Sequence, residues 1–428
     1  MGTMHNYFLN PFNAPWYQHN GTFWDVGHGT FFHGQIQKYF PISDRHRFCR
    51  SNYRSTVFTY IYDCGASNPA NIKSAISEAL SEGLVDGEDI DLLIISHFHQ
   101  DHINGIFDLQ RQLKLKKRRI KNILIPFVHP HRIHFLRPCD ISVPDDLTPE
   151  QAAKVYERLL INPVGTLIEE INPDQIYLSF PAGIVESSND QVDSVFIVDP
   201  PDPRRGNERG ENPRDEGPSL QGFVRSVPLS SQQLESLGIN GIDSNKVRTI
   251  PSGCGITFLN WQILTYTKSY PGFDNLSLQQ FLDKHRIEIF SSGNFKKIMK
   301  MIGSYHRQNG HSLCIYSGVR DPSGTGNRGI VLSGDSNLGQ KEDWKEIFEN
   351  LDLSDKSIDF LVPHHGSRKG RGPHIYNSNV IDNLLIAPNK SYGKMYTTSI
   401  KRHIASTGKS LKTLNKGDSP YRIRFRFF

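Results

Sequence analysis

A cluster of metal-binding residue types follows a short apolar segment near the end of the first quarter of the chain. The segment Asp91–Ser96 (DLLIIS) has the composition of a buried strand, and His97, His99, Asp101 and His102 come directly after it. Side chains alternate past a strand end, so His97 and His99 are expected to point to the same side. Asp101 and His102 would begin a helix and turn towards a second ion. Neutral imidazoles with a carboxylate suit zinc, and also manganese or iron.

Two later segments place further ligand types at the ends of predicted strands. Gly329–Asp335 (GIVLSGD) ends in Asp335, whose carboxylate is able to bridge two ions. Ile358–Ser367 (IDFLVPHHGS) ends a strand with the paired histidines His364 and His365. A Gly-Asp turn or a pair of surface histidines is ordinary when taken alone. In this order after the first cluster, they predict one shared metal centre.

In these motifs the chain resembles the metallo-β-lactamase superfamily, whose signature is an H-x-H-x-D-H run, a Gly-Asp strand end and a late histidine. It resembles more closely the soluble domain of bacterial competence (DNA-uptake) channel proteins. The resemblance covers roughly residues 20–107 and 255–428. The stretches that carry it are Asp25–Gly29, Tyr62–Gly65, Ser96–His102, Asn309–Ser317, Leu332–Asp335, Val362–Ser367 and Ile386–Gly393.

The resemblance implies two divalent metal ions, zinc in the first place, held by seven side chains. The first ion takes His97, His99 and His311, the second takes Asp101 and His102, Asp335 bridges both, and His365 is the late ligand. His311 is assigned because it precedes the bridging aspartate by 24 residues. The alternatives for completing the first site are His129, His131 and His134.

The chain departs from the channel-type domains at a few positions. Those domains usually have Gln and Asp where this chain has His28 and Thr30, and they often have His where it has Lys394. They usually have Asp in place of His99, so the ligand set is more complete here. We expect Lys394 to contact substrate.

This ligand set predicts hydrolysis by an activated water. Two ions about 3.5–4 Å apart lower the pKa of a water that they share and clamp the leaving oxygen. Asp101 would orient the water, and His364 would stabilise the developing negative charge or protonate the leaving group. Asp101 and His364 are therefore the predicted catalytic residues.

The predicted bond is a phosphodiester, with nucleic acid as a possible substrate, so the expected activity is that of a nuclease or phosphodiesterase. The basic run Leu113–Lys121 (LKLKKRRIK) could track phosphates through Lys116, Lys117, Arg118 and Arg119, although a solvated helix end has the same composition. Hydrolysis of a small-molecule ester, lactone or phosphoester is the alternative. A metal-stabilised binding component of a larger assembly is the third hypothesis.

The elements that would position these residues are strands and helices in alternation. Val57–Tyr62 reads as a strand, Ile72–Leu80 as a helix and Ile330–Ser333 as a later strand. We predict an α/β fold, the αββα sandwich of the metallo-β-lactamase superfamily, with two mixed sheets flanked by helices. A large insertion is predicted after the H-x-H-x-D-H motif, over residues 108–254, partly helical and with a mobile loop over 200–222.

Composition sets broader limits. With 37% hydrophobic residues in 428, the chain is able to build a large core. The net charge of +5 permits an anionic substrate without requiring one. Five scattered cysteines, no secretory signal and no long apolar stretch predict a cytoplasmic protein that does not span a membrane.

Overall fold

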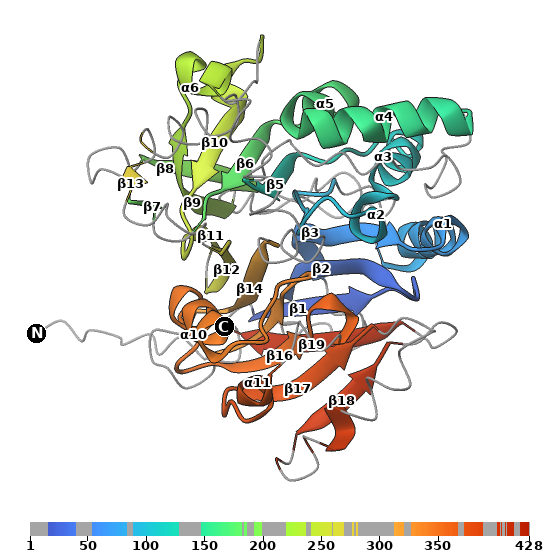
Figure 1. The fold of residues 1–428 in the computed structure, drawn as a ribbon. Helices are drawn as coiled ribbons and strands as arrows, with labels where there is room; N and C mark the ends of the chain where they lie inside the picture. Colours follow the sequence, from blue (N-terminus) through green and yellow to red (C-terminus); the bar gives the residue numbers. More distant parts are fainter. Residues whose placement is uncertain are drawn as a thin grey trace, which may run out of the picture.

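The structure is a computed structural model, and it shows two β-sheets that face each other with helices on their outer sides (Figure 1). It describes residues 16–39, 54–83, 89–127, 147–181, 184–185, 192–198, 220–236, 241–258, 260–268, 276–277, 280, 312–320, 327–366, 372–387, 400–402, 404, 407, 409–414 and 420–427.

The first sheet combines an antiparallel half and a parallel half. Its order is β19 (Tyr421–Phe427), β1 (Trp16–Phe23), β2 (Gly29–Tyr39), β3 (Arg54–Ala66), β4 (Leu92–Ile94), β5 (Asn122–Pro126), β6 (Gln175–Ser179), β10 (Val247–Ile250) and β9 (Leu220–Pro228). Neighbours from β3 to β10 run parallel, so their C-terminal ends lie at one edge of the sheet.

The second sheet shares β9 with the first. From β9 it continues through β11 (Gly255–Phe258), β12 (Trp261–Tyr266), β14 (Cys314–Val319), β15 (Arg328–Leu332), β16 (Ser357–Leu361), β17 (Ile381–Ile386) and β18 (Ser410–Thr413), with β8 (Val192–Val198) on the other side of β9. Pairs from β15 to β18 are parallel. Two short strands, β7 (Ile184–Val185) and β13 (Leu276–Ser277), pair with each other.

Alternation along the strands divides the core into layers. In and just after β4, Leu92 and Ile94 pack between the sheets, whereas Leu93 and Ile95 pack against helices. The helices on the outer side of the first sheet are α1 (Pro69–Glu78), α3 (Ile106–Leu115), α4 (Pro149–Ile161) and α5 (Pro163–Ile171). Those on the second are α10 (Lys341–Asn350) and α11 (Pro373–Tyr376). Two mixed sheets flanked by helices are the predicted fold class.

The limits of the predicted insertion need correction. Residues 108–254 supply β5, β6 and β10 to the first sheet, and α3 runs across the predicted boundary at 107. Apolar runs such as Asn122–Pro126 are buried along their whole length, as strands in the parallel part of a sheet are. Of the predicted loop, residues 200–219 lie outside the described part of the chain, and β9 begins at Leu220.

Candidate metal centre

Asp63, a buried aspartate near the end of β3, holds the loop that follows β4. It accepts hydrogen bonds from the backbone N–H and the hydroxyl of Ser96, both at 2.7 Å. Its Oδ2 also lies 2.7 Å from Nδ1 of His102, which belongs to α2 (Gln100–Ile103). Nε2 of His102 is therefore directed away from Asp63, towards the centre. Asp63 is not among the predicted site residues, although it directly follows the predicted strand Val57–Tyr62.

The second sheet brings its ligands from two adjacent parallel strands. Asp335 follows β15, and His364 and His365 follow β16, so both sets emerge at the same edge of the sheet. Gly334 makes the approach to the first sheet possible: its φ is +51°, and a Cβ there would lie 2.8 Å from Cβ of Ser96. A larger residue at this position would separate the two halves of the centre.

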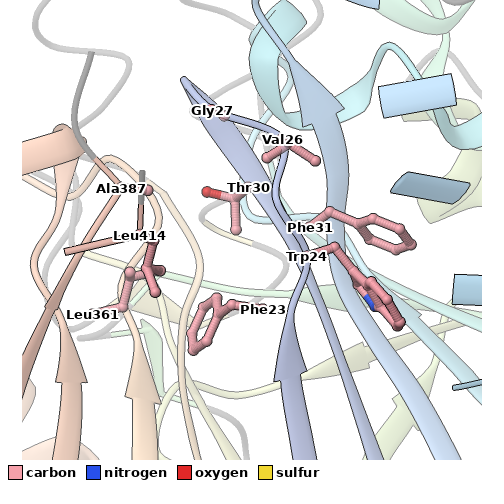
Figure 2. A pocket seen from close by; sticks show the side chains of 10 residues that line it. Phe23, Trp24, Val26, Gly27, Thr30, Phe31, Leu361, Ala387 and Leu414 are labelled. Atoms are coloured by element: carbon pink, nitrogen blue, oxygen red, sulfur yellow. The ribbon is translucent and has the colours of Figure 1, made fainter. Parts of the chain in front are cut away.

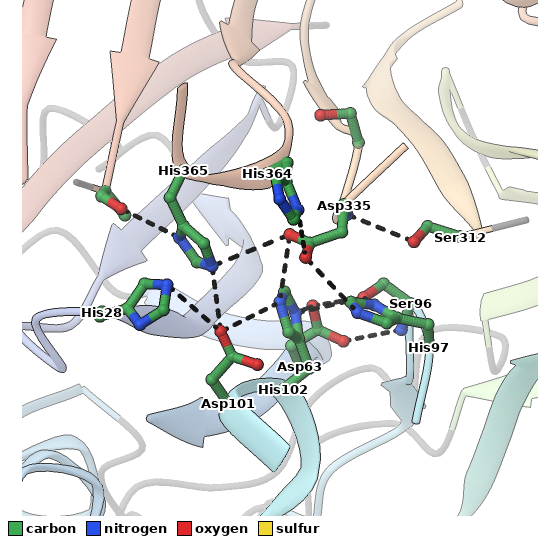
Figure 3. A network of polar contacts seen from close by, with 12 residues as sticks. His28, Asp63, Ser96, His97, Asp101, His102, Ser312, Asp335, His364 and His365 are labelled. Atoms are coloured by element: carbon green, nitrogen blue, oxygen red, sulfur yellow. Dashed lines mark hydrogen bonds and ion pairs between the residues drawn. The ribbon is translucent and has the colours of Figure 1, made fainter. Parts of the chain in front are cut away.

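Ligand atoms from the two sheets converge on one point (Figure 3). Nε2 of His97 is 3.8 Å and Nε2 of His102 is 3.4 Å from the carboxylate of Asp335. Nε2 of His365 lies 3.1 Å from Oδ2 of Asp101 and 3.8 Å from Oδ1 of Asp335. Asp335 thus stands between ligands of the first cluster and the late histidine, the place expected of a bridging carboxylate.

Three sets of side chains have ligand atoms within 4.8 Å of one another. They are His97–His99–Asp335, His102–Asp335–His365 and His28–Asp101–His365. The first set contains His97, His99 and the bridging Asp335, which are predicted ligands of the first ion; the other predicted ligand, His311, lies outside the described residues. The other two surround the predicted place of the second, and they share His365.

The donor atoms fit divalent ions. Among the described residues, Nε2 of His97 and Nε2 of His102 are buried and have no hydrogen-bond partner. A polar atom buried in this way costs free energy unless it binds something. Both nitrogens face the Asp335 carboxylate, and imidazole nitrogens beside carboxylate oxygens are the donor set that zinc, manganese and iron accept.

The charges at the centre also favour a cation. Burial and then the neighbouring histidines lower the pKa of His97, which keeps its ring neutral. Burial tends to raise the pKa of Asp335, but the nearby imidazoles outweigh it, and this pKa lies well below its usual value. For His102, burial is outweighed by three carboxylates, so the pKa is raised. The ionised carboxylate of Asp335 therefore faces imidazole rings that are able to bind a metal ion. His102 binds a proton when no metal ion is bound.

Of the remaining predicted residues, the structure describes His364 but not His311 or Lys394. His364 belongs to the centre: its Nδ1 lies 2.8 Å from Oδ2 of Asp335, and its side chain is 23% exposed, so solvent and substrate are able to reach it. The predicted residues His311 and Lys394, and the alternatives His129, His131 and His134, lie outside the described part of the chain.

His28, which is not among the predicted ligands, lies at the rim of the centre. Its Nε2 is 3.6 Å from Oδ2 of Asp101, and its ring centroid is 4.1 Å from that of His365. The available signal was its position between two glycines in DVGHGT, where the channel-type domains usually have Gln.

The basic cluster Lys116–Arg119 is not brought to the centre. Ile90 and Arg119 are hydrogen-bonded neighbours at the N-terminal ends of β4 and β5, whereas His97 follows the C-terminal end of β4. The cluster therefore lies at the opposite edge of the first sheet. Arg119 forms a two-pronged ion pair with Asp174 at 2.8 Å, which already engages its guanidinium.

An apolar pocket adjoins the centre between β2 and the second sheet (Figure 2). Its lining residues are Phe23, Trp24, Val26, Gly27, Gly29, Thr30, Phe31, Leu361, Ala387 and Leu414. Ala387 links it to the centre, because its carbonyl accepts a hydrogen bond from Nδ1 of His365 at 3.0 Å.

Comparison with known proteins supports the fold. The family model described as Metallo-beta-lactamase superfamily matches residues 55–164, the part that contains the first ligand cluster. Together with the two flanked sheets, this match confirms the predicted fold class and supports a metal-binding hydrolase. The chain is also similar to the crystal structure of the metallo-beta-lactamase fold protein YhfI from Bacillus subtilis, with 9% identity, 96% of this chain and 99% of that chain covered, and a TM-score of 0.33. No curated protein sequence matches the chain.

Across the described residues, no helix is both long and apolar enough to cross a membrane.

Proposed function

We infer that the protein is a metal-dependent hydrolase that acts on phosphodiester bonds. One observation supports this above the others: ligand side chains from the ends of β4, β15 and β16 converge within 4.8 Å, and two of their nitrogens are buried without a hydrogen-bond partner among the described residues. Bound divalent ions would supply an activated water and a clamp for the leaving oxygen.

The side chains of the chain have separate tasks in this proposal. His97, His99 and Asp335 would hold one ion, and His102, His365 and Asp335 would hold the other together with Asp101, whose carboxylate lies 3.1 Å from His365. The carboxylate of Asp101 would also accept a hydrogen bond from the attacking water and orient it.

His364 is the proposed proton donor. Its side chain is 23% exposed, and its Nδ1 lies 2.8 Å from Oδ2 of Asp335, which places the ring beside the centre and within reach of a substrate. From this position His364 would donate to the developing negative charge or to the leaving oxygen.

The phosphodiester assignment follows the resemblance to DNA-uptake channel domains and agrees with the net charge of +5. The basic cluster no longer supports it, because that cluster lies at the other edge of the sheet. The second candidate is hydrolysis of a small ester or lactone, but the apolar pocket beside His365 is too small to hold such a substrate and does not favour it. The near-complete ligand set argues against a purely structural metal site.

The test is a substrate panel with metal-loaded protein. Single-stranded DNA, duplex DNA, RNA, bis-nitrophenyl phosphate and a lactone are compared for wild type and for Asp335→Asn. We expect phosphodiester turnover by wild type and its loss in the variant. Turnover of the lactone but of no phosphodiester would make the protein a small-molecule ester or lactone hydrolase. Activity that survives in Asp335→Asn would contradict the metal mechanism.

A further inference from the structure

The loop between β1 and β2 brings His28 against two proposed ligands of the second ion. Nε2 of His28 lies 3.6 Å from Oδ2 of Asp101, and the rings of His28 and His365 meet edge to face at 4.1 Å. One ligand atom from each of the three residues lies within 4.8 Å of the others. Figure 3 shows the His28 and His365 rings on the same side of the Asp101 carboxylate.

The ring of His28 is oriented by its other nitrogen. Nδ1 lies 2.5 Å from the hydroxyl of Ser67, and the backbone N–H of Ser67 donates to the carbonyl of His28 at 2.7 Å. His365 is arranged in the same way, with Nδ1 on the Ala387 carbonyl and Nε2 towards Asp101. An imidazole that binds a metal through Nε2 is usually held through Nδ1 like this.

The backbone around His28 is built for close approach. Gly29 has a φ of +146°, and a Cβ there would lie 2.4 Å from the carbonyl oxygen of Gly65 and 2.8 Å from that of Asp101. The loop therefore packs directly on the backbone that carries Asp101. His28 is held beside the centre by this packing as well as by its own side chain.

We propose that His28 is a ligand of the second metal ion, together with Asp101 and His365. Two imidazoles and a carboxylate suit zinc, and also manganese or iron. The inference rests on the proposed metal-dependent function, but it concerns a residue outside the H-x-H-x-D-H, Gly-Asp and late-histidine motifs. It would give this chain one more protein ligand than those motifs supply, taken from the glycine-flanked loop before β2.

The experiment measures metal binding by the full-length protein after chelator treatment. Zinc is titrated in competition with a chromogenic chelator, and Co²⁺ absorption spectra report the coordination of each ion. His28→Gln introduces the residue that channel-type domains usually have. Ser67→Ala removes only the support of the ring. His374→Gln is the control, because His374 is also partly exposed but contacts the carbonyl of Leu338.

In His28→Gln, we expect the first ion to bind as in wild type and the second to bind at least about 10-fold more weakly, since the loss of a supporting residue alone costs 10- to 100-fold. The Co²⁺ spectrum of the second ion should change, Ser67→Ala should show a smaller loss, and His374→Gln should match wild type. Unchanged affinity and spectrum in His28→Gln would overturn the proposal, even if turnover fell. If wild type itself bound no metal, the proposed function would fail first, and this inference with it.

Discussion

Three residues of the centre have positive φ although they carry side chains: Asp63 at 55°, His364 at 50° and His365 at 53°. Each costs about 1–2 kcal/mol relative to ordinary backbone. The contacts of these residues explain why the conformation is kept, because Asp63 orients His102 and His365 reaches Asp101. Strain of this kind is common where a fold holds side chains in a functional geometry.

His364 allows a test of chemistry separately from metal binding. Its partial exposure and its contact with Asp335 place it beside the ions without making it a proposed ligand. We expect His364→Ala to lower turnover by roughly 10²–10⁴-fold, the range for one acid–base group. Metal content, measured by mass spectrometry of the intact protein, should stay near two ions. Loss of an ion from this variant would show that His364 supports binding instead.

At the scale of elements, the centre depends on how closely α2 approaches β3. Gly65 of β3 lies directly against α2. A Cβ at position 65 would lie 2.5 Å from the backbone nitrogen of His102. The backbone of an α2 residue offers no flexible end that could move aside. Glycine is therefore required here by space, and helix α2, which carries Asp101 and His102, is positioned by this contact.

We expect Gly65→Ala to lower the free energy of unfolding by about 1–3 kcal/mol and to weaken metal binding, because it forces α2 away from β3. Gly241→Ala is the matched control: Gly241 has a φ of +73° but nothing within 4 Å of the added Cβ. The control should cost about 1–2 kcal/mol through backbone strain and leave metal binding unchanged. Urea unfolding and zinc titration measure both effects. Equal zinc affinity in the two variants would contradict the packing argument.

A buried carboxylate, that of Asp91, joins the middle of β3 to the N-terminal ends of β4 and β5. Oδ2 of Asp91 accepts a hydrogen bond from the backbone N–H of Thr59 at 2.8 Å, and Oδ1 lies 3.2 Å from Nζ of Lys121. Burial raises the pKa of Asp91 to about 6, and Lys121 only partly offsets it. The folded protein therefore holds this proton more tightly than the unfolded chain does, where the pKa is about 3.9.

This shift predicts a pH dependence of stability. The contribution of Asp91 is fully present below about pH 4 and is lost as the pH rises through about 6, with a total on the order of 2–3 kcal/mol. In metal-free protein, the free energy of unfolding of wild type should therefore fall relative to that of Asp91→Asn across this window. Urea unfolding at pH 4 to 7 measures the difference. A constant difference would mean that Asp91 is ionised in the folded state throughout.

At the scale of the whole molecule, the two edges of the first sheet have different roles. The C-terminal edge of the parallel strands meets the second sheet at the centre, and the N-terminal edge carries the basic cluster Lys116–Arg119. The composition of this cluster predicted that it tracks the phosphates of the substrate, but its position at the edge away from the centre does not favour that role. A substrate that is bound at the centre is not expected to reach Lys116 and Lys117 unless it extends around the sheet.

We therefore expect the double variant Lys116→Gln, Lys117→Gln to hydrolyse DNA, RNA or bis-nitrophenyl phosphate within about twofold of wild type, because exposed charges far from the bound phosphate are largely screened. Both lysines are exposed, so the variant should fold normally. A salt titration of activity is the measurement. A weaker salt dependence in the variant on DNA or RNA, but not on the small phosphodiester, would show that a long substrate does reach this edge.

Much of the centre could be predicted from local spacing. His97 and His99 follow β4, and Asp101 and His102 lie in the first turn of α2, so a strand end followed at once by a helix start is enough to bring them together. The Gly-Asp end of β15 and the histidines after β16 could be added because C-terminal ends of neighbouring parallel strands meet at one edge. The alternating strands and helices likewise indicated two sheets between layers of helices.

Other features were decided only by the tertiary structure. His28 reaches Asp101 because β2 pairs with β3 in a register that sets Gly29 opposite Ala66. Strand β5 joins the first sheet although it lies within the predicted insertion, and its pairing places the basic cluster at the far edge. Residues in one loop are placed by local backbone geometry, which the sequence encodes directly. Residues in separate elements are placed by strand order and register, which depend on how the whole core packs.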